Sequence, residues 1–195
     1  NEWGNLVNRS ISMAHKNVGA IPEASELLDI DRALLDACRD AYTTIGGLLG
    51  RARFKQAISE AMRIVSLANK YISDCEPWKL KSDPERRDTV LHVALQAVQD
   101  CNTLLTPFLP HSAQKVFEAL GGEGVWAAQP QIVTVDEDDA PSYPVLRGDY
   151  TVEQARWASR PIAVGTPLAK PTPIFAKLDE TLGETGPSWA PVLAG

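Results

Sequence analysis

Three side chains in this sequence, Asn5, Arg9 and Trp78, have the types and spacing needed to bind a planar hydrogen-bonding group. Asn5 and Arg9 are four residues apart, so on a helix they lie one turn apart on the same face. Pro77 fixes its own backbone angle and restricts Glu76, so we expect Trp78 to leave a helix in a rigid turn. An aromatic ring can stack on a nucleobase, while an amide and a guanidinium bind its edge or the adjacent phosphate.

Each of these residues also has a purely structural interpretation. A Trp at the end of a helix more often folds back as a lid on the core. An Asn and an Arg one turn apart are more often part of a solvated polar face. The local sequence therefore leaves open whether Trp78 is a buried lid or an exposed stacking platform, and the solvent exposure of Trp78 distinguishes the two.

Other patterns that would indicate catalysis or metal binding are absent from the sequence. His15, His92 and His111 have no Asp, Glu or Cys at ligand spacing, so we expect no metal site. The sequence has no glycine-rich phosphate loop after a strand and no Gly-x-Ser-x-Gly elbow, so we assign it no catalytic residue and no cofactor. Its cysteines are odd in number and far apart, which predicts no disulfide framework and fits a reducing, cytosolic setting: Cys38, Cys75 and Cys101.

The composition is that of an ordinary globular protein with one good core and a small second unit. The chain has 195 residues, of which 44% are hydrophobic and 23% are charged. No apolar run approaches 18 residues, so we predict no membrane-spanning segment and no membrane partner. The chain begins at Asn1 without an initiator Met or a signal-peptide pattern, and we interpret it as a piece of a longer protein.

A net charge of −6 argues against a nucleic-acid partner, but the distribution of the charge weakens that objection. Residues 1–120 carry a net charge of −1 and residues 121–195 carry −5. A cluster of basic residues is also typical of a solvated face, so it permits a nucleic-acid role without requiring one. The basic residues around the third predicted helix are Arg51, Arg53, Lys55, Arg63, Lys70, Lys79, Lys81, Arg86 and Arg87.

The spacing of apolar residues predicts five helices in residues 1–122. Asp31 is the expected N-cap of the second helix and Asp83 that of the fourth, where Pro84 takes the first helical position. Short connections between helices favour a bundle, so the predicted fold is all-α. The expected ranges are 3–17, 31–50, 52–74, 84–105 and 111–120.

Beyond residue 122 we expect an irregular, proline-rich extension containing one short helix. A short strand is possible at 132–135, followed by an acidic turn at 136–139 and a proline-rich stretch at 140–148. Residues 151–154 read as a capping box that opens a two-turn helix containing Trp157. Residues 165–179 are expected to be extended and to dock on a neighbouring surface, and residues 180–195 to be a flexible tail.

Several of these segments together resemble the anticodon-binding domain of methionyl-tRNA synthetases, which are class I aminoacyl-tRNA synthetases. The resemblance begins with Gly4-Asn5-Leu6-Val7-Asn8-Arg9 and continues in Ala68-Asn69-Lys70-Tyr71 and Pro77-Trp78. It extends through Phe108-Leu109-Pro110 and the closing segment from Gly165-Thr166-Pro167 to Asp179, and so covers most of the chain.

The resemblance implies that the chain reads the CAU anticodon in the anticodon loop of tRNA(Met). Trp78 would stack on the first anticodon base, a cytosine, supported by Pro77, while Asn5 and Arg9 match the family's other reading positions. The full-length enzyme would ligate methionine to tRNA in the cytoplasm, using ATP with magnesium. Neither the HIGH-type nor the KMSKS-type nucleotide-binding motif occurs in this sequence, so this chain alone should be inactive.

The expected organisation has three parts. Residues 1–122 form the helical anticodon-binding bundle, and residues 123–179 pack back on it and toward the catalytic domain of the same polypeptide. Residues 180–195 form the tail. Two alternatives stay open: a helical protein-docking module with no RNA role, in which Trp78 is a lid, and the anticodon domain of another class I synthetase.

Overall fold

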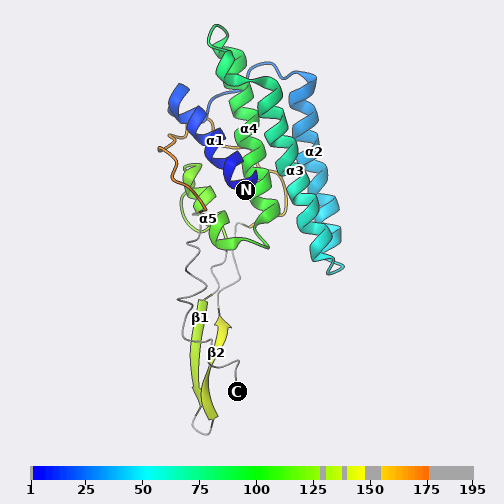
Figure 1. The fold of residues 1–195 in the computed structure, drawn as a ribbon, viewed down its shortest axis with the longest axis vertical. Coiled ribbons are helices and arrows are strands. Elements are labelled where there is room, and N and C mark those ends of the chain that lie inside the picture. The colour runs from blue at the N-terminus through cyan, green and yellow to red at the C-terminus, as the bar shows by residue number, and fades with distance from the viewer. Residues whose placement is uncertain (1, 128–130, 138–139, 148–154, 176–195) are drawn as a thin grey trace, which may run out of the picture.

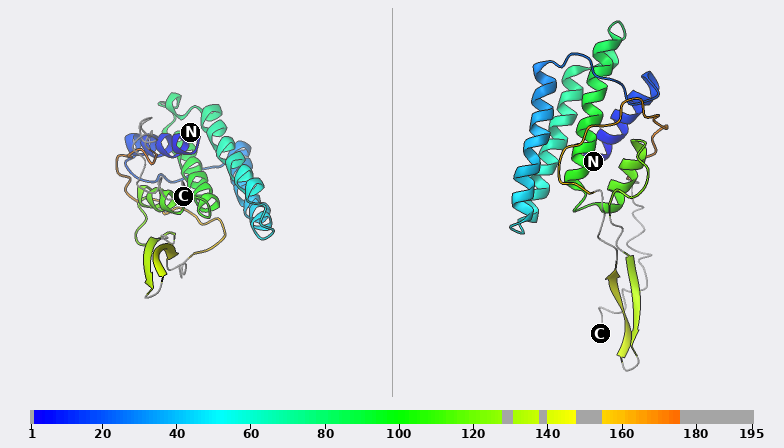
Figure 2. Two further views of the ribbon diagram at one scale, coloured as in Figure 1. Left: turned by 60° about the horizontal axis from the view of Figure 1, so that its bottom comes forward. Right: turned by 180° about the vertical axis from the view of Figure 1, so that it is seen from behind.

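A computed structural model describes residues 2–127, 131–137, 140–147 and 155–175. In this part of the chain, α2, α3 and α4 lie side by side as three long helices, and α1 and α5 pack against α4 (Figures 1 and 2). The five helices confirm the predicted bundle. They are α1 (Glu2–Asn17), α2 (Asp29–Leu49), α3 (Phe54–Cys75), α4 (Pro84–Leu105) and α5 (Pro110–Ala119).

Helix α4 is the centre of the core. It contacts all four of the other helices, and for this reason it is buried on nearly every side, whereas α2 and α3 bury a single stripe. The burial includes polar side chains such as Gln96, Asp100 and Asn102. The sequence pattern alone identified only the apolar residues of this helix.

The helix starts agree with the predicted caps in one case and not in the other. Asp83 is the N-cap of α4, and its carboxylate accepts a hydrogen bond from the Arg86 amide at 3.1 Å, as predicted. Asp31 is not the N-cap of α2, because that helix begins two residues earlier at Asp29. Asp31 instead lies in the first turn, and its carboxylate accepts a hydrogen bond from the Leu28 amide at 2.8 Å.

The extension contains a β-hairpin, which corrects the expectation that it is irregular. Strands β1 (Gln131–Glu137) and β2 (Ala140–Arg147) are antiparallel, with Ile132 opposite Leu146. The hairpin projects from the end of the bundle near α5 (Figure 1). The sequence indicated part of β1 but not β2, because Pro141 and Pro144 lie in β2 and argue against a strand there. These prolines are tolerated since a two-stranded hairpin has only edge strands.

Trp157 does not lie in a helix, because residues 155–160 are irregular. The capping box at 151–154 lies outside the described residues. Trp157 is positioned by tertiary contacts: its indole nitrogen donates to the Tyr42 carbonyl at 2.8 Å, and its ring meets the Tyr42 ring edge-to-face with centroids 5.5 Å apart. Trp157 is therefore fixed by contacts with Tyr42 of α2 and not by a helix of its own.

The segment at 165–168 docks on the bundle, as the sequence predicted. The Ile21 amide donates to the Thr166 carbonyl and the Leu168 amide donates to the Gly19 carbonyl, at 2.9 and 3.0 Å. Leu168 is buried in the core. These bonds attach the end of the described chain to the connection between α1 and α2. The predicted continuation at 176–179 and the tail at 180–195 lie outside the described residues.

Alanine substitutions at Gly46 and Gly47 should have opposite effects on stability, although the two residues are neighbours in α2. A Cβ at residue 47 would find only the flexible Arg51 guanidinium, at 3.5 Å, so Gly47→Ala should stabilise the protein by about 0.5–1 kcal/mol. A Cβ at residue 46 would lie 2.8 Å from the Trp157 indole nitrogen, so Gly46→Ala should cost about 1–3 kcal/mol. Thermal unfolding of both variants measures the difference, and equal shifts would mean that Trp157 does not pack on Gly46.

Candidate nucleic-acid interface

The turn after α3 presents Trp78 to solvent. Glu76 ends the helix in the left-handed conformation, with φ 46° and ψ 54°, and the 3₁₀ turn η1 (Pro77–Lys79) follows at once. The turn is closed by the Lys79 amide, which donates to the Glu76 carbonyl at 2.8 Å. Pro77 is buried, whereas Trp78 is 43% exposed. Trp78 is therefore not a lid on the core.

Arg9 lies against the exposed Trp78 ring. Its guanidinium carbon is 4.9 Å from the ring centroid, and its Nη1 donates to the Ser73 hydroxyl at 3.3 Å. A cation over an indole ring at this distance contributes about 0.5–1 kcal/mol at an exposed site. Asn5 is exposed one turn earlier on α1, on the same face. The bundle thus brings Arg9 to Trp78 and leaves Asn5 accessible beside it.

Helix α1 is held in this position by contacts at its start. The Ser66 hydroxyl donates to the Glu2 carboxylate at 2.7 Å. The side-chain amide of Asn69 donates to the backbone carbonyl of Glu2 at 3.2 Å. Ser66, Asn69 and Ser73 all lie on α3, so three positions of this helix fix the face of α1 that carries Asn5 and Arg9.

A buried ion pair fixes the helices on both sides of the Trp78 turn. Asp31 is fully buried, and the Arg86 guanidinium binds it through two hydrogen bonds, the longer being 2.8 Å. The Tyr71 hydroxyl donates to the same carboxylate at 2.7 Å. Tyr71 is in the last turns of α3 and Arg86 is in the first turn of α4. The pair therefore ties the two ends that flank η1 to the start of α2.

The charges of this cluster are stabilised by one another. Burial by itself would raise the pKa of Asp31, but hydrogen bonds from Arg86, Tyr71 and the Leu28 amide together lower it below its ordinary value of 3.8. The hydrogen bond to Asp31 raises the pKa of Arg86. Burial, and then the hydrogen bond to Asp31, raise the pKa of Tyr71. The network therefore consists of a carboxylate, a guanidinium and a neutral phenol.

Sequence reasoning missed two residues of this region. Ser73 contacts Arg9, but a serine on the polar face of a helix carries no distinguishing signal. Arg86 was grouped with basic residues of a solvated face, whereas its side chain is only 18% exposed and pairs with Asp31, 55 residues away. Only the folded chain brings those two residues together.

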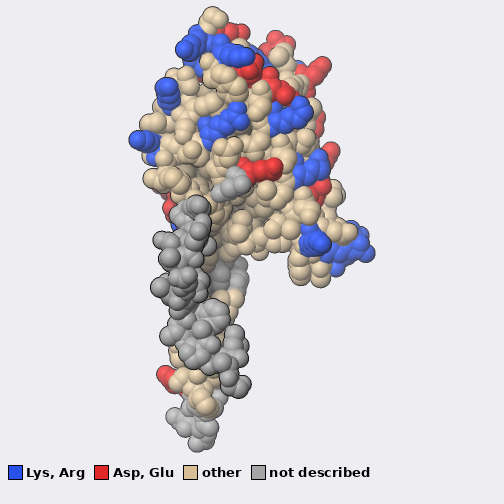
Figure 3. Space-filling model, viewed as in Figure 1, with Lys and Arg blue, Asp and Glu red and all other residues tan. Residues whose placement is uncertain are grey.

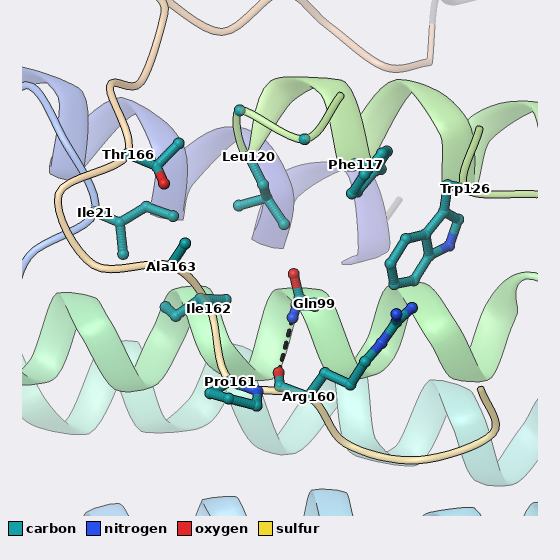
Figure 4. Close-up of a pocket in the computed structure, with 12 residues that line it drawn as sticks. Ile21, Gln99, Phe117, Leu120, Trp126, Arg160, Pro161, Ile162, Ala163 and Thr166 are labelled. Atoms are coloured by element: carbon teal, nitrogen blue, oxygen red, sulfur yellow. Dashed lines mark hydrogen bonds between the residues drawn. The ribbon is translucent and has the colours of Figure 1, made fainter. Parts of the chain in front are cut away.

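A recess lies beside the docked segment, away from the Trp78 turn. A cavity of about 210 Å³ opens between α4, α5 and residues 160–166, and Arg160 reaches from that segment over the Trp126 ring (Figure 4). The Gln99 side chain holds this segment through a hydrogen bond of 2.8 Å to the Arg160 carbonyl (Figure 4). These contacts fasten the extension to the bundle.

Two features are absent from the described residues. These residues contain no group of three or more His, Cys, Asp or Glu side chains placed to hold a metal ion. Of the helices in this part of the chain, none has both the length and the hydropathy that a bilayer-spanning segment requires.

Comparison with known proteins assigns the bundle to a family. A family model described as the anticodon binding domain of methionyl tRNA ligase matches residues 21–136, which is more than half of the chain. The chain belongs to this family. The resemblance to methionyl-tRNA synthetases that the sequence indicated is therefore confirmed. Membership of this family removes the alternative of another class I synthetase.

Individual relatives carry the same name. The methionine–tRNA ligase of Cutibacterium acnes is 67% identical over 98% of this chain, and that of Saccharopolyspora erythraea is 64% identical over 98%. The chain spans about a third of the length of these relatives, 31% and 33%. It is thus similar to one part of a methionyl-tRNA ligase, and the catalytic domain is not in it.

Solved structures agree with the family at the level of the fold. The free-state crystal structure of Mycobacterium tuberculosis methionyl-tRNA synthetase matches 92% of this chain with a TM-score of 0.69 and 27% identity, over 32% of its own chain. A structure of the same enzyme bound by methionyl-adenylate matches 90% of this chain with a TM-score of 0.69 and 27% identity, over 31% of its own. The anticodon-binding bundle of the methionyl-tRNA ligase family is therefore the fold of this chain.

Proposed function

We propose that this bundle reads the CAU anticodon of tRNA(Met) with Trp78, Arg9 and Asn5. Trp78 stacks on the first anticodon base, a cytosine, while Arg9 and Asn5 supply hydrogen bonds to the base edges or to the adjacent phosphate. Pro77 supports Trp78 by fixing the turn. The observation that carries the proposal is the placement of the Arg9 guanidinium against a Trp78 ring that is 43% exposed.

These side chains are held in place before RNA binds. A base that stacks on a ring already fixed by a buried proline and a short turn does not have to order it first. A guanidinium beside the ring provides planar donors for a base or a phosphate. The Ser73 hydroxyl that binds Arg9 holds those donors in place in the free protein.

The proposal extends to the whole polypeptide. The full-length protein ligates methionine to tRNA(Met) in the cytoplasm with ATP and magnesium, and its catalytic domain lies outside this chain. Residues 1–122 serve as the anticodon-binding bundle and residues 123–179 as the extension toward the catalytic domain. The contacts of residues 160–168 with α1, α4 and the connection at 19–21 support this role for the extension.

Exchanging the anticodon in the full-length enzyme tests the proposal. We expect tRNA(Met) whose first anticodon base is changed from C to A to bind at least about tenfold more weakly, which corresponds to about 1.4 kcal/mol. Arg9→Ala should reduce this preference if Arg9 binds a base, and should instead lower the salt dependence if it binds a phosphate. Filter binding at two salt concentrations separates the two cases.

Lys16→Ala is the matched control. Lys16 is an exposed lysine on the same helix as Arg9, and it forms no ion pair among the described residues. It should leave the anticodon preference unchanged. Equal binding of both RNAs by the unsubstituted enzyme would reject the proposed function.

A further inference from the structure

The connection between α2 and α3 carries an isolated group of positive charge in an otherwise acidic chain. From Ala41 to Ser59 the sequence has no Asp or Glu, yet it contains Arg51, Arg53 and Lys55, and all three are exposed. In the described part of the chain none of the three forms an ion pair. We call residues 51–55 the basic tip. It is the blue group at the lower right of Figure 3.

One face of α3 joins the basic tip to the Trp78 turn. Taking about 100° per residue, Lys55, Ser66 and Ser73 lie within an arc of roughly 20°. Ser66 and Ser73 bond to Glu2 and Arg9 of α1, so this arc is the face beside the proposed anticodon reader. Lysine and arginine side chains recur along this side of the molecule in Figure 3. The tip and the reader are therefore opposite ends of one exposed face.

Along this face the basic tip carries charge without an ion pair, whereas at the other end Lys79 is paired with Glu76 and the cation beside Trp78 is Arg9. Arg63 is bonded to Glu60, and Lys70 is bonded to Asp74, so acidic partners compensate the bases in the middle. Helix α3 has 22 residues, which places the tip about 33 Å from the Trp78 turn. At about 2.8–3.4 Å per stacked base step, from A-form RNA to B-form DNA, that distance corresponds to roughly ten to twelve steps of a nucleic-acid helix.

We infer that the basic tip binds backbone phosphates of the same tRNA whose anticodon lies on Trp78, roughly ten to twelve base steps from the anticodon. This inference rests on the proposed function and adds a second contact to it. Phosphate contacts position an RNA without reading its sequence, so the tip sets affinity and orientation while Trp78 sets anticodon preference. The chemistry fits because three cations without an ion pair, in a stretch without Asp or Glu, match a phosphate backbone.

The competing occupant of the tip is a protein surface, such as another part of the same polypeptide. Phe54 and Ile58 are 57% and 36% exposed beside the tip, and exposed apolar side chains suit a protein partner. On the helix they lie about 100° and 60° away from Lys55, so they border the charged face and do not interrupt it. The charge and the face shared with Arg9 favour RNA.

The test replaces Arg51, Arg53 and Lys55 with glutamine in the full-length enzyme. We expect binding of intact tRNA(Met) at low salt to weaken by about tenfold or more. The negative slope of log affinity against log salt should become shallower by about 2, for two to three lost phosphate contacts. An anticodon loop closed by only two base pairs ends several base steps before the tip, so its affinity should stay unchanged. The preference for CAU should also stay unchanged.

The control variant removes the same charge elsewhere, with Lys16, Arg32 and Lys115 replaced by glutamine, all of which are exposed. An equal loss in this control would overturn the inference, as would an equal loss for the stem-loop or an unchanged salt slope with intact tRNA. Lower thermal stability of the tip variant with unchanged tRNA binding would assign the tip to a protein partner. Failure of anticodon preference in the unsubstituted enzyme would reject the proposed function and not the tip contact.

Discussion

Arg86→Met should lower the free energy of unfolding by about 3–5 kcal/mol, because it leaves the fully buried Asp31 carboxylate without its cation. This is a large part of the 5–15 kcal/mol by which a domain is normally stable. The Tyr71 and Leu28 hydrogen bonds to Asp31 remain in the variant, but neither carries a charge. Urea denaturation near pH 7 measures the loss.

The pH dependence of this loss follows from the direction of the Asp31 pKa. In the unsubstituted protein that pKa is lowered, so the stability it contributes is present above pH 3.8 and disappears as the pH falls through the folded-state value. In Arg86→Met, burial is no longer offset by the guanidinium and the pKa of Asp31 rises. As the pH falls toward about 4, protonation of Asp31 removes the buried unpaired charge in the variant. The difference in the free energy of unfolding between the unsubstituted protein and Arg86→Met should therefore become smaller.

Arg39→Met is the matched control for Arg86→Met. Arg39 pairs with Asp36, but the two side chains are 63% and 60% exposed, so the expected loss is only about 0–1 kcal/mol. Equal losses in the two variants, or a difference from the unsubstituted protein that stays constant with pH, would show that the Asp31 carboxylate is not the group left unpaired.

Trp78→Ala should weaken binding of tRNA(Met) to the full-length enzyme by about 1–3 kcal/mol, or roughly 5- to 150-fold, because it removes the ring on which the first anticodon base is proposed to stack. The loss should be specific to the CAU anticodon, so that RNAs with and without it bind the variant almost equally. Stability should change little, since Trp78 is exposed and its neighbour Pro77 stays buried.

Trp78→Phe distinguishes stacking from other roles of this residue. A phenyl ring keeps a flat surface for a base and a face for the Arg9 guanidinium, so most of the lost affinity should return. If Trp78→Ala bound CAU and altered anticodons with the affinities of the unsubstituted enzyme, stacking on Trp78 would be ruled out. The salt slope should not change in either variant, which separates this residue from the basic tip.

The helices could be predicted from the sequence because their signals are local. Apolar residues at helical spacing, the Asp83-Pro84 start and the proline after Cys75 each act within one or two turns, and each is found where it was expected. The hairpin was only partly predicted, since Pro141 and Pro144 argue against a strand unless it is known to be an edge. Trp157 was assigned to a helix on the capping box at 151–154, because its hydrogen bond to the Tyr42 carbonyl, 115 residues away, leaves no local signal.

The sequence by itself determined the five-helix bundle, the rigid Pro77-Trp78 step and the one-turn spacing of Asn5 and Arg9, because backbone geometry over a few residues decides all three. The tertiary structure decided that Trp78 is exposed, that Arg9 lies on its ring and that Arg86 neutralises Asp31. The two contacts join residues that are 55 and 69 positions apart in the sequence. Only the packing of α1, α2 and α4 against α3 brings these residues together.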